Sequence, residues 1–279
     1  MALSPGEVPD SVSGDLAGYR FWTAFTAAQA VNAGRPVEAV GKRVRRFFHD
    51  VCRLVEPGLC LELGAHEGSF SRWARRNLPQ ATCLALEANP YVHAKFRERL
   101  SESGVDYRNL AATTSSGPVT LTIPTQIGEQ AKGRANRMGS LAVHRSDRAH
   151  ETVEVEGVRV DELDEVSSAG PTVAWIDVEG ASEQVLEGAR GIMARADAVY
   201  IEVEIEEMWP GQWLELDVAR YFLELGLVPV MRDLQRPHQH NVVFASAALA
   251  TRPDVAELAA AVYRPVRQPK ESQGVAEPG

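Results

Sequence analysis

Acidic side chains recur at the ends of several apolar runs in this sequence. Glu62 lies in LCLELGAHEGSF, Glu87 ends the run in ALEANP, and Asp177 and Glu179 follow TVAWI. A further run, AVYIEVEIEE, carries Glu202. Carboxylates accept hydrogen bonds, take protons from nucleophiles and balance bound cations. If these runs are strands of one parallel sheet, the acids gather at its carboxyl edge, where open α/β sheets bind their ligands.

The segment around Glu62 resembles a nucleotide-binding turn. A buried run leads into Gly64, three residues follow, and Gly68 opens a helical pattern. The G-x-x-x-G spacing lacks the glycine that lets a pyrophosphate approach the backbone in dinucleotide folds. An acid before the turn also repels a diphosphate but attracts a cation, and S-adenosylmethionine carries an ammonium, a sulfonium and no phosphate. The turn therefore favours a site for S-adenosylmethionine over a strand-to-helix connection that binds no ligand.

Glu87 ends the next strand, where a doubly wound fold places a carboxylate that accepts both ribose hydroxyls. Ala88 and Asn89 would then flank the adenine, and Pro90 would start the next helix. The alternative is a surface acid that interacts with a helix dipole. Because both predicted strands end in acids, we favour the cofactor interpretation.

The acids after the later strands, Asp177, Glu179, Glu202 and Glu204, could bind a metal, orient a hydroxyl or accept its proton. Any of them could equally cap a helix or face water. Two mechanisms stay open: Asp177 or a loop histidine acts as the base, or a divalent cation lowers the pKa of the hydroxyl. We favour the metal-independent mechanism and assign no metal ligand.

The remaining candidates lie in segments that would cover a substrate. His144 and His240 fall in a polar loop and in the last hairpin, whereas His49 is interpreted as a surface residue of a helix. Trp209 could form an aromatic wall or pack in the core. The basic residues Lys42, Arg43, Arg45 and Arg46 are interpreted as the solvated face of their helix.

Apolar runs alternate with helical patterns along the chain, which predicts a doubly wound, mostly parallel sheet with helices on both faces. The expected strands are Leu59 to Leu63, Ala81 to Glu87, Tyr107 to Ala111, Thr172 to Asp177 and Ala198 to Val203. GLVPVMRD and HNVVFAS predict a closing antiparallel hairpin. An amphipathic helix in VEAVGKRVRRFFHDVCRLV should pack on the main core.

This pattern predicts four segments. They are a flexible N-terminus (1–18), an N-terminal helical extension (19–56), the cofactor-binding domain (57–250), and a C-terminal helix with a flexible tail (251–279). Within the domain, the period-two stretches PVTLTI and TVEVEGVRV predict a hairpin-like excursion. The polar stretch 126–151 between them is interpreted as a mobile substrate loop.

The composition narrows the function classes. The 279 residues carry a net charge of −9, which disfavours binding to nucleic acid. The cysteines lack metal-type spacing and suit buried thiols in a reducing compartment. No stretch reads as a membrane span or a leader. We expect a cytoplasmic protein with a small-molecule partner, and no feature of the sequence indicates an oligomeric state.

Seven phrases in order resemble the FkbM family of S-adenosylmethionine-dependent O-methyltransferases, over roughly residues 57–246. They are CLELGAHEGSF, ALEANP, NLAATTSSGPVTL, VRVDELDE, WIDVEGASEQVLEGA, YIEVE and HNVVF. The sequence departs from the family at Ser182, where an acid is frequent, and at His66, where Asn is common. The resemblance implies a Rossmann-like class I methyltransferase fold. It also implies methyl transfer to a hydroxyl oxygen of a small molecule, such as a natural product or a glycoside.

The resemblance places the glycine turn at the methionine end of the cofactor, Glu87 at the ribose, Ala111 and Ala112 at the adenine, and Asp177 beside the transferable methyl. The cofactor candidates are Glu62, Gly64, Ala65, His66, Gly68, Glu87, Ala88, Asn89, Ala111, Ala112 and Asp177. The catalytic candidates are Asp177, Glu179 and His144, and the acceptor candidates are Met138, Ser140, Glu202, Trp209 and His240. Two alternatives remain. An NAD-dependent oxidoreductase is disfavoured by the glycine spacing, and a non-catalytic binding module on this fold is disfavoured by the acids.

Overall fold

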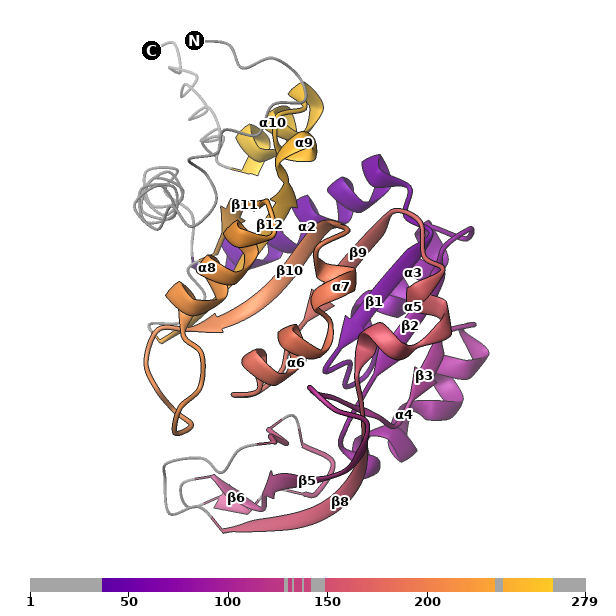
Figure 1. The fold of residues 1–279 in the computed structure, drawn as a ribbon, viewed down its shortest axis with the longest axis vertical. Helices are drawn as coiled ribbons and strands as arrows, with labels where there is room; N and C mark the ends of the chain where they lie inside the picture. The colour runs from indigo at the N-terminus through magenta and orange to yellow at the C-terminus, as the bar shows by residue number, and fades with distance from the viewer. Residues whose placement is uncertain are drawn as a thin grey trace, which may run out of the picture.

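The structure is a computed structural model that describes residues 37–262 except 128–129, 132, 137, 142–148 and 234–237. Its centre is a seven-stranded sheet in the order β11-β12-β10-β9-β1-β2-β3 (Figure 1). The strands are β1 (Leu59–Leu63), β2 (Thr82–Leu86), β3 (Asp106–Arg108), β9 (Thr172–Ile176), β10 (Ala196–Glu204), β11 (Leu227–Arg232) and β12 (Gln239–Ser246). The neighbours from β3 to β10 pair in parallel, and β12 is antiparallel to β10 and β11. The predicted doubly wound fold with a closing hairpin is therefore confirmed.

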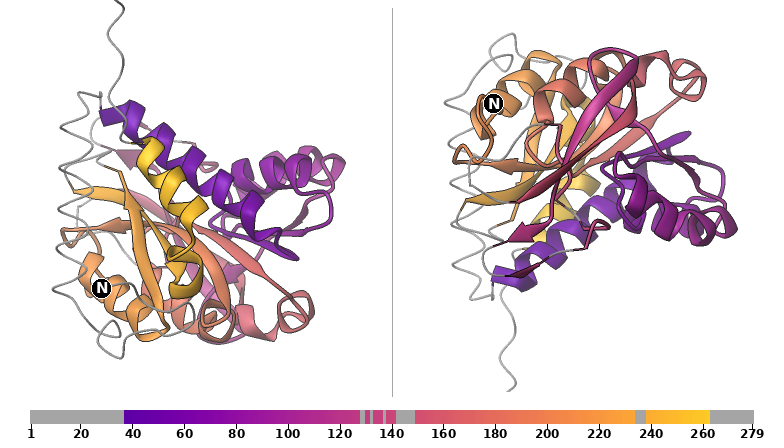
Figure 2. Two further views of the ribbon diagram at one scale, coloured as in Figure 1. Left: turned by 90° about the horizontal axis from the view of Figure 1, so that it is seen from above. Right: turned by 90° about the horizontal axis from the view of Figure 1, so that it is seen from below.

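Helices cover both faces of this sheet because its central strands are apolar on both sides. In β1, for example, Leu61 contributes to one buried cluster and Cys60 to the other. The first face carries α6 (Ser182–Gly188), α7 (Arg190–Met193) and α8 (Glu215–Glu224), and the second carries α2 (Val37–Val55), α3 (Ser69–Asn77) and α10 (Pro253–Val262). Figure 2 shows α10 lying against α2. The helix α4 (Pro90–Glu102) links β2 to β3, and α9 (Ala247–Ala250) follows β12.

The amphipathic pattern of the first described helix decides where it lies. Val44, Phe48 and Val51 of α2 are fully buried against the sheet, whereas Lys42 and Arg46 are exposed. Cys52 of α2 and the other two cysteines are buried free thiols, as expected. The helix α2 therefore belongs to the same core as the sheet that it covers. Among the described residues, no helix is long and apolar enough to cross a membrane.

The excursion after β3 forms a second sheet of three strands in the order β4-β8-β5. In it β5 (Gly117–Pro124) pairs antiparallel with β8 (His150–Val158), which confirms the predicted hairpin, and β4 (Ala111–Ala112) runs parallel to β8. The short strands β6 (Gln126–Ile127) and β7 (Gln130–Ala131) pair with each other. The expectation of one strand from Tyr107 to Ala111 was wrong. The Asn109 side chain donates to the carbonyls of Glu87 and Ala88, and the chain leaves the main sheet there.

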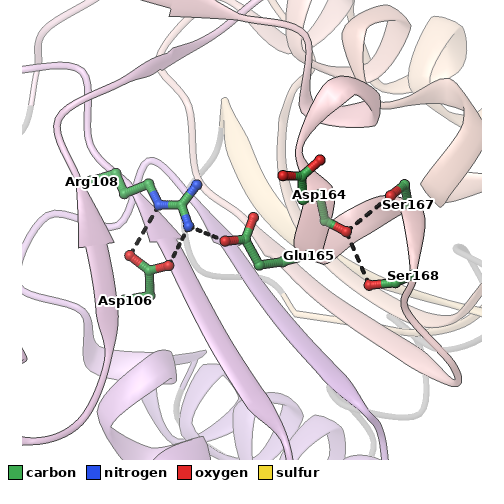
Figure 3. Close-up of polar contacts among 6 residues, drawn as sticks. All are labelled: Asp106, Arg108, Asp164, Glu165, Ser167 and Ser168. Atoms are coloured by element: carbon green, nitrogen blue, oxygen red, sulfur yellow. Dashed lines mark hydrogen bonds and ion pairs between the residues drawn. The ribbon is translucent and has the colours of Figure 1, made fainter.

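A polar cluster ties the edge strand β3 to the crossover that leads into β9. The crossover contains the 3-10 helix η1 (Val160–Glu162) and α5 (Asp164–Ser167). Arg108 of β3 is held between Asp106 and Glu165 (Figure 3). The hydroxyls of Ser167 and Ser168 close α5 by donating to the carbonyl of Asp164. Because the Arg108 guanidinium favours the ionised carboxylate, it lowers the pKa of Glu165.

Candidate active site

The strand register brings the residues that follow four strands into one row. The last paired residues of β2, β1, β9 and β10 in that register are Leu86, Leu63, Ile176 and Ile201. The residues that follow these four in the chain are Glu87, Gly64, Asp177 and Glu202, and Asn241 of β12 pairs with Glu202. We call these five residues the carboxyl-edge row. All five line one cavity of about 440 Å³. This volume lies in the range of small-molecule sites.

Glu62 lies under the glycine turn and has a structural task of its own. Its two carboxylate oxygens accept hydrogen bonds from the backbone N–H groups of Phe70 (3.1 Å) and Ser71 (2.8 Å) in the first turn of α3. Burial raises the pKa of Glu62 to about 7, although these hydrogen bonds favour the ionised form. Glu62 therefore both caps α3 and presents a carboxyl group to the cavity that it lines.

The turn itself is built from left-handed residues. Gly64 has φ 76°, and a Cβ there would lie 1.9 Å from the carbonyl oxygen of Asp177, so only glycine fits between β1 and β9. His66 has φ 45°. His is one of the few residue types, with Asn and Asp, that are enriched in this region. His66 is therefore compatible with the turn, and it lines the cavity.

Glu87 is fixed by the backbone on either side of it. Its Oε2 accepts from the N–H of His66 (2.7 Å) and its Oε1 from the N–H of Asn89 (2.8 Å). The residue is 9% exposed, and burial raises its pKa to about 7. The carboxyl group is therefore positioned in advance at the cavity wall, beside Ala88, Ala111 and Ala112.

Asn89 has a different place from the one expected beside the adenine. Its Oδ1 accepts from the N–H groups of Tyr91 and Val92 and so caps α4, and its Nδ2 donates to the carbonyl of Arg134. It does not belong to the cavity wall. An Asn before Pro90 is a common N-cap, so its sequence position already allowed this role.

The acids at the centre of the carboxyl-edge row are electrostatically coupled. Glu202 shares a side-chain hydrogen bond with Asp177, and the pKa of Glu202 is raised by burial and then by the charges of Asp177, Glu179 and Glu204. Gln239 also donates to Glu202 Oε1 at 2.6 Å. Two adjacent carboxyl groups that cannot both ionise share a proton, so Glu202 holds a proton that it can donate to Asp177. The Asp177 side chain is exposed to the cavity.

The other candidates divide into two groups. Those on the cavity wall are Glu62, Gly64, Ala65, His66, Glu87, Ala88, Ala111, Ala112, Ser140, Asp177, Glu179 and Glu202. Those off the wall are Gly68, Asn89, Met138, Trp209 and His240. Ser140 donates to the Glu179 carbonyl at 2.6 Å, whereas His240 is buried against Glu215 at 2.9 Å. His144 lies outside the described residues, as does part of the stretch 126–151. No group of three His, Cys, Asp or Glu side chains in the described part of the chain has the arrangement of a metal centre.

The cavity also has residues that the sequence interpretation missed: Arg45 and His49 from α2, Phe70 from α3, Trp175, Tyr200 and Asn241. Trp175 and Tyr200 precede Asp177 and Glu202 by two positions, so the period of a strand puts them on the same face, and this signal was available in the sequence. The interpretation of His49 as a surface residue was wrong. Its ring is half-buried and stacks 3.8 Å from that of Trp73, and burial followed by Arg45 and Arg53 lowers its pKa to about 3.

Comparisons with known proteins bear on this site. The family described as "Methyltransferase FkbM domain" matches residues 62–232, more than half of the chain. Among solved structures, methyltransferase FkbM from Methylobacillus flagellatus KT is 12% identical, with a TM-score of 0.44 over 68% of this chain and 44% of that one. The chain thus spans less than half of that protein's length. A 1,6-didemethyltoxoflavin-N1-methyltransferase from Burkholderia thailandensis, solved with bound 1,6-didemethyltoxoflavin and S-adenosylhomocysteine, is 14% identical, with a TM-score of 0.39 over 87% of this chain and 94% of that one. No curated protein gives a significant match.

Proposed function

Because the chain belongs to the FkbM family of methyltransferases, we propose that it transfers a methyl group from S-adenosylmethionine to a hydroxyl oxygen of a small molecule, such as a natural product or a glycoside. The observation that carries this proposal is the carboxyl-edge row. It puts Glu87, the glycine turn and Asp177 on the wall of one cavity. When bound, the cofactor supplies a methyl group on a cationic sulfonium, which a nucleophile can attack directly.

The residues on the β1–β2 side of the row suit this cofactor. A carboxylate offers about four acceptor positions, so Glu87 can bind two ribose hydroxyls while it keeps its two backbone N–H partners. Ala88, Ala111 and Ala112 give the cavity wall small apolar side chains, which suit a flat base. Glu62 and Glu87 together balance a cationic ligand, and a positive charge beside them favours their ionised forms.

Asp177 lies at the centre of the row, between Gly64 and Glu202 in the strand order. A ligand held over β1 and β2 therefore meets an acceptor over β9 and β10 at Asp177. Its exposed carboxylate can accept the proton of a hydroxyl that lies within hydrogen-bond reach. The hydrogen bond with Glu202 orients Asp177 and removes the cost of a second adjacent negative charge. The cavity walls align the hydroxyl oxygen with the methyl group that it attacks. We expect this alignment to supply the largest part of the catalysis.

The first experiment is calorimetric titration of the protein with S-adenosylhomocysteine and, separately, with NADH. We expect micromolar or tighter binding of the first and none of the second. Heat from NADH alone would support a dehydrogenase, and the absence of heat from both would refute a cofactor site here.

The second experiment identifies the acceptor atom. The protein is incubated with S-adenosylmethionine labelled with 13C in the methyl group and a panel of hydroxylated glycosides and macrolides. The chemical shift of the transferred methyl distinguishes oxygen, nitrogen and carbon acceptors, and we expect oxygen. A methyl group on nitrogen or carbon would leave the enzyme a methyltransferase and refute the hydroxyl acceptor.

A further inference from the structure

The cavity continues beyond the acids onto the face of the sheet that α2 covers. Trp175 and Tyr200 lie two residues before Asp177 and Glu202, so their side chains project to the same face. Phe70 from α3 and His49 from α2 complete this part of the wall, which we call the aromatic arm: His49, Phe70, Trp175 and Tyr200. Phe70 and Tyr200 are buried, with 2% and 1% of their surface exposed, so the apolar surface that a ligand can contact next to the proposed transfer site comes from Trp175 and His49.

The aromatic arm is held in place by ring contacts. Trp175 and Tyr200 stack with their centroids 3.7 Å apart and an interplanar angle of 11°, and Phe70 stacks 5.7 Å from Trp175. Phe48, buried in α2, touches Phe70, Trp175 and Tyr200 from behind. Fixed rings of this kind bind a planar or ring-shaped ligand at little cost in side-chain entropy.

A cation stands at the aromatic arm. The guanidinium of Arg45 lies 5.7 Å from the centre of the Trp175 ring, and Arg45 lines the cavity although its side chain is largely exposed. No described carboxylate forms an ion pair with Arg45, whereas its neighbour Arg46 pairs with Asp50 at 3.8 Å. A guanidinium at this cation–π distance keeps its N–H groups available for two parallel hydrogen bonds to a carboxylate or phosphate.

The cavity wall therefore carries both the acids of the carboxyl-edge row and, beside the Trp175 ring, the cation Arg45. Burial raises the pKa of Tyr200, the charge of Asp233 raises it further, Arg45 lowers it, and Asp177 and Glu202 raise it, so Tyr200 is influenced by both Arg45 and the acids. A ligand with a hydroxyl at one end and an anionic group at the other matches this distribution of charge, because an anion placed beside the acids would be repelled.

The position of α2 associates Arg45 with the acceptor. The helix α2 packs on β10 and β12, on the far side of β9 from the strands β1 and β2 that carry the glycine turn and Glu87. The Arg45 guanidinium lies over Trp175 of β9, two residues before Asp177, and so near the part of the cavity where the hydroxyl partner of Asp177 must lie.

We infer that the acceptor is a hydroxylated ring compound with a carboxylate or phosphate group, and that Arg45 binds this anion while the ring lies along Trp175. This inference rests on the proposed function, because Asp177 sets where the hydroxyl lies. It also assigns α2 to the acceptor site, which makes Arg45 a residue that determines substrate specificity.

The test compares matched acidic and neutral probes on the protein saturated with S-adenosylhomocysteine. The carboxylate pair is 4-hydroxybenzoate and 4-hydroxybenzamide, and the phosphate pair is 4-hydroxyphenyl phosphate and hydroquinone. We expect the acid of at least one pair to bind about tenfold more tightly than its neutral partner, since a charge-assisted hydrogen bond is worth about 1.5 kcal/mol or more. Which pair shows the preference distinguishes a carboxylate from a phosphate.

The variants are Arg45→Gln and, as the matched control, Arg46→Gln, both on exposed positions of one helix. We expect Arg45→Gln to lose the preference for the acid and Arg46→Gln to keep it, with unchanged circular dichroism and unchanged affinity for S-adenosylhomocysteine in both. Equal binding of acids and neutral partners, a preference that survives Arg45→Gln, or no binding of any acidic probe would overturn the inference.

The cofactor affinity separates the remaining outcomes. If Arg45→Gln weakens S-adenosylhomocysteine about tenfold, Arg45 binds the carboxylate of the cofactor instead, and the inference is overturned. Failure of the wild-type protein to bind S-adenosylhomocysteine at all would refute the proposed function rather than the role of Arg45 alone.

Discussion

The affinity for S-adenosylhomocysteine should depend on pH through Glu87. This buried carboxyl has its pKa raised from 4.5 to about 7. Two ribose hydroxyls donate to the ionised form, so a protonated Glu87 must lose its proton before it can accept both of them. Because the protonated fraction grows as the pH falls through 7, the affinity should weaken toward acid pH.

The size of the effect follows from the linkage between binding and ionisation. With a pKa of about 7 and binding only to the carboxylate, about half of the protein is competent at pH 7 and roughly one part in ten at pH 6. The Kd should therefore rise about tenfold between pH 8 and pH 6. Glu62 has its pKa raised to about 7 and lines the same cavity, so the wild-type profile is at least as steep as this.

The assay is calorimetric titration with S-adenosylhomocysteine from pH 6 to pH 8. The Glu87→Gln variant should bind more weakly at pH 8, because its amide accepts through one oxygen only, and it should lose about one order of magnitude of the pH dependence. Glu204→Gln is the matched control. Glu204 has a pKa raised to about 7 by burial but is not part of the cavity wall, so that variant should keep the wild-type profile. A flat wild-type profile, or an equally steep one in Glu87→Gln, would refute the assignment of Glu87 to the ribose.

Three further expectations concern catalysis and stability. Asp177→Asn should lower turnover about a hundredfold or more with little change in cofactor affinity, whereas near-normal turnover would exclude Asp177 as the base. If a chelator also abolishes the activity of the wild-type protein, a bound metal takes part in the reaction. The melting temperature of the ligand-free protein should fall from pH 5 to pH 8. Glu62, Glu87 and Glu204 are buried and have pKa values of about 7, so over this range they bind more protons in the folded state than in the unfolded state. A melting temperature that rises over this range would contradict that reasoning. In urea denaturation, Gly180→Ala should lose about 1 to 3 kcal/mol more stability than Gly211→Ala. Both glycines have positive φ, but only at position 180 would a Cβ lie 2.4 Å from the indole of Trp209, so equal losses would show that this contact is readily relieved.

Much of the fold could be predicted because its signals are local. The strands β1, β9 and β12 are short apolar runs, and the helix patterns between them repeat at three and four residues, so neither required knowledge of distant contacts. The boundary after Arg108 could not be predicted in the same way. The pairing of the two-residue strand β4 with β8 depends on a segment more than forty positions away in the chain, which no local pattern encodes.

The acids of the site illustrate the same division. Their place at the ends of apolar runs predicted that they would share one edge, because parallel strands end on the same side of a sheet. Asn89 was assigned to the cofactor on similar grounds, but a helix cap competes for its side chain, and only the structure shows that the cap prevails.

By itself, the sequence determined which residues end the strands and which face of each strand they share, since both follow from the alternation of side chains along an extended chain. The tertiary structure decided that β9 lies beside β1, which puts Asp177 next to Gly64, and that α2 lies over β10 and β12. That second placement turns Arg45 from an expected solvated face toward the cavity. The tertiary structure also decided which carboxyl groups are buried, and burial raises the pKa values of Glu62 and Glu87. Desolvation depends on everything that packs around a group and not on its neighbours in the chain.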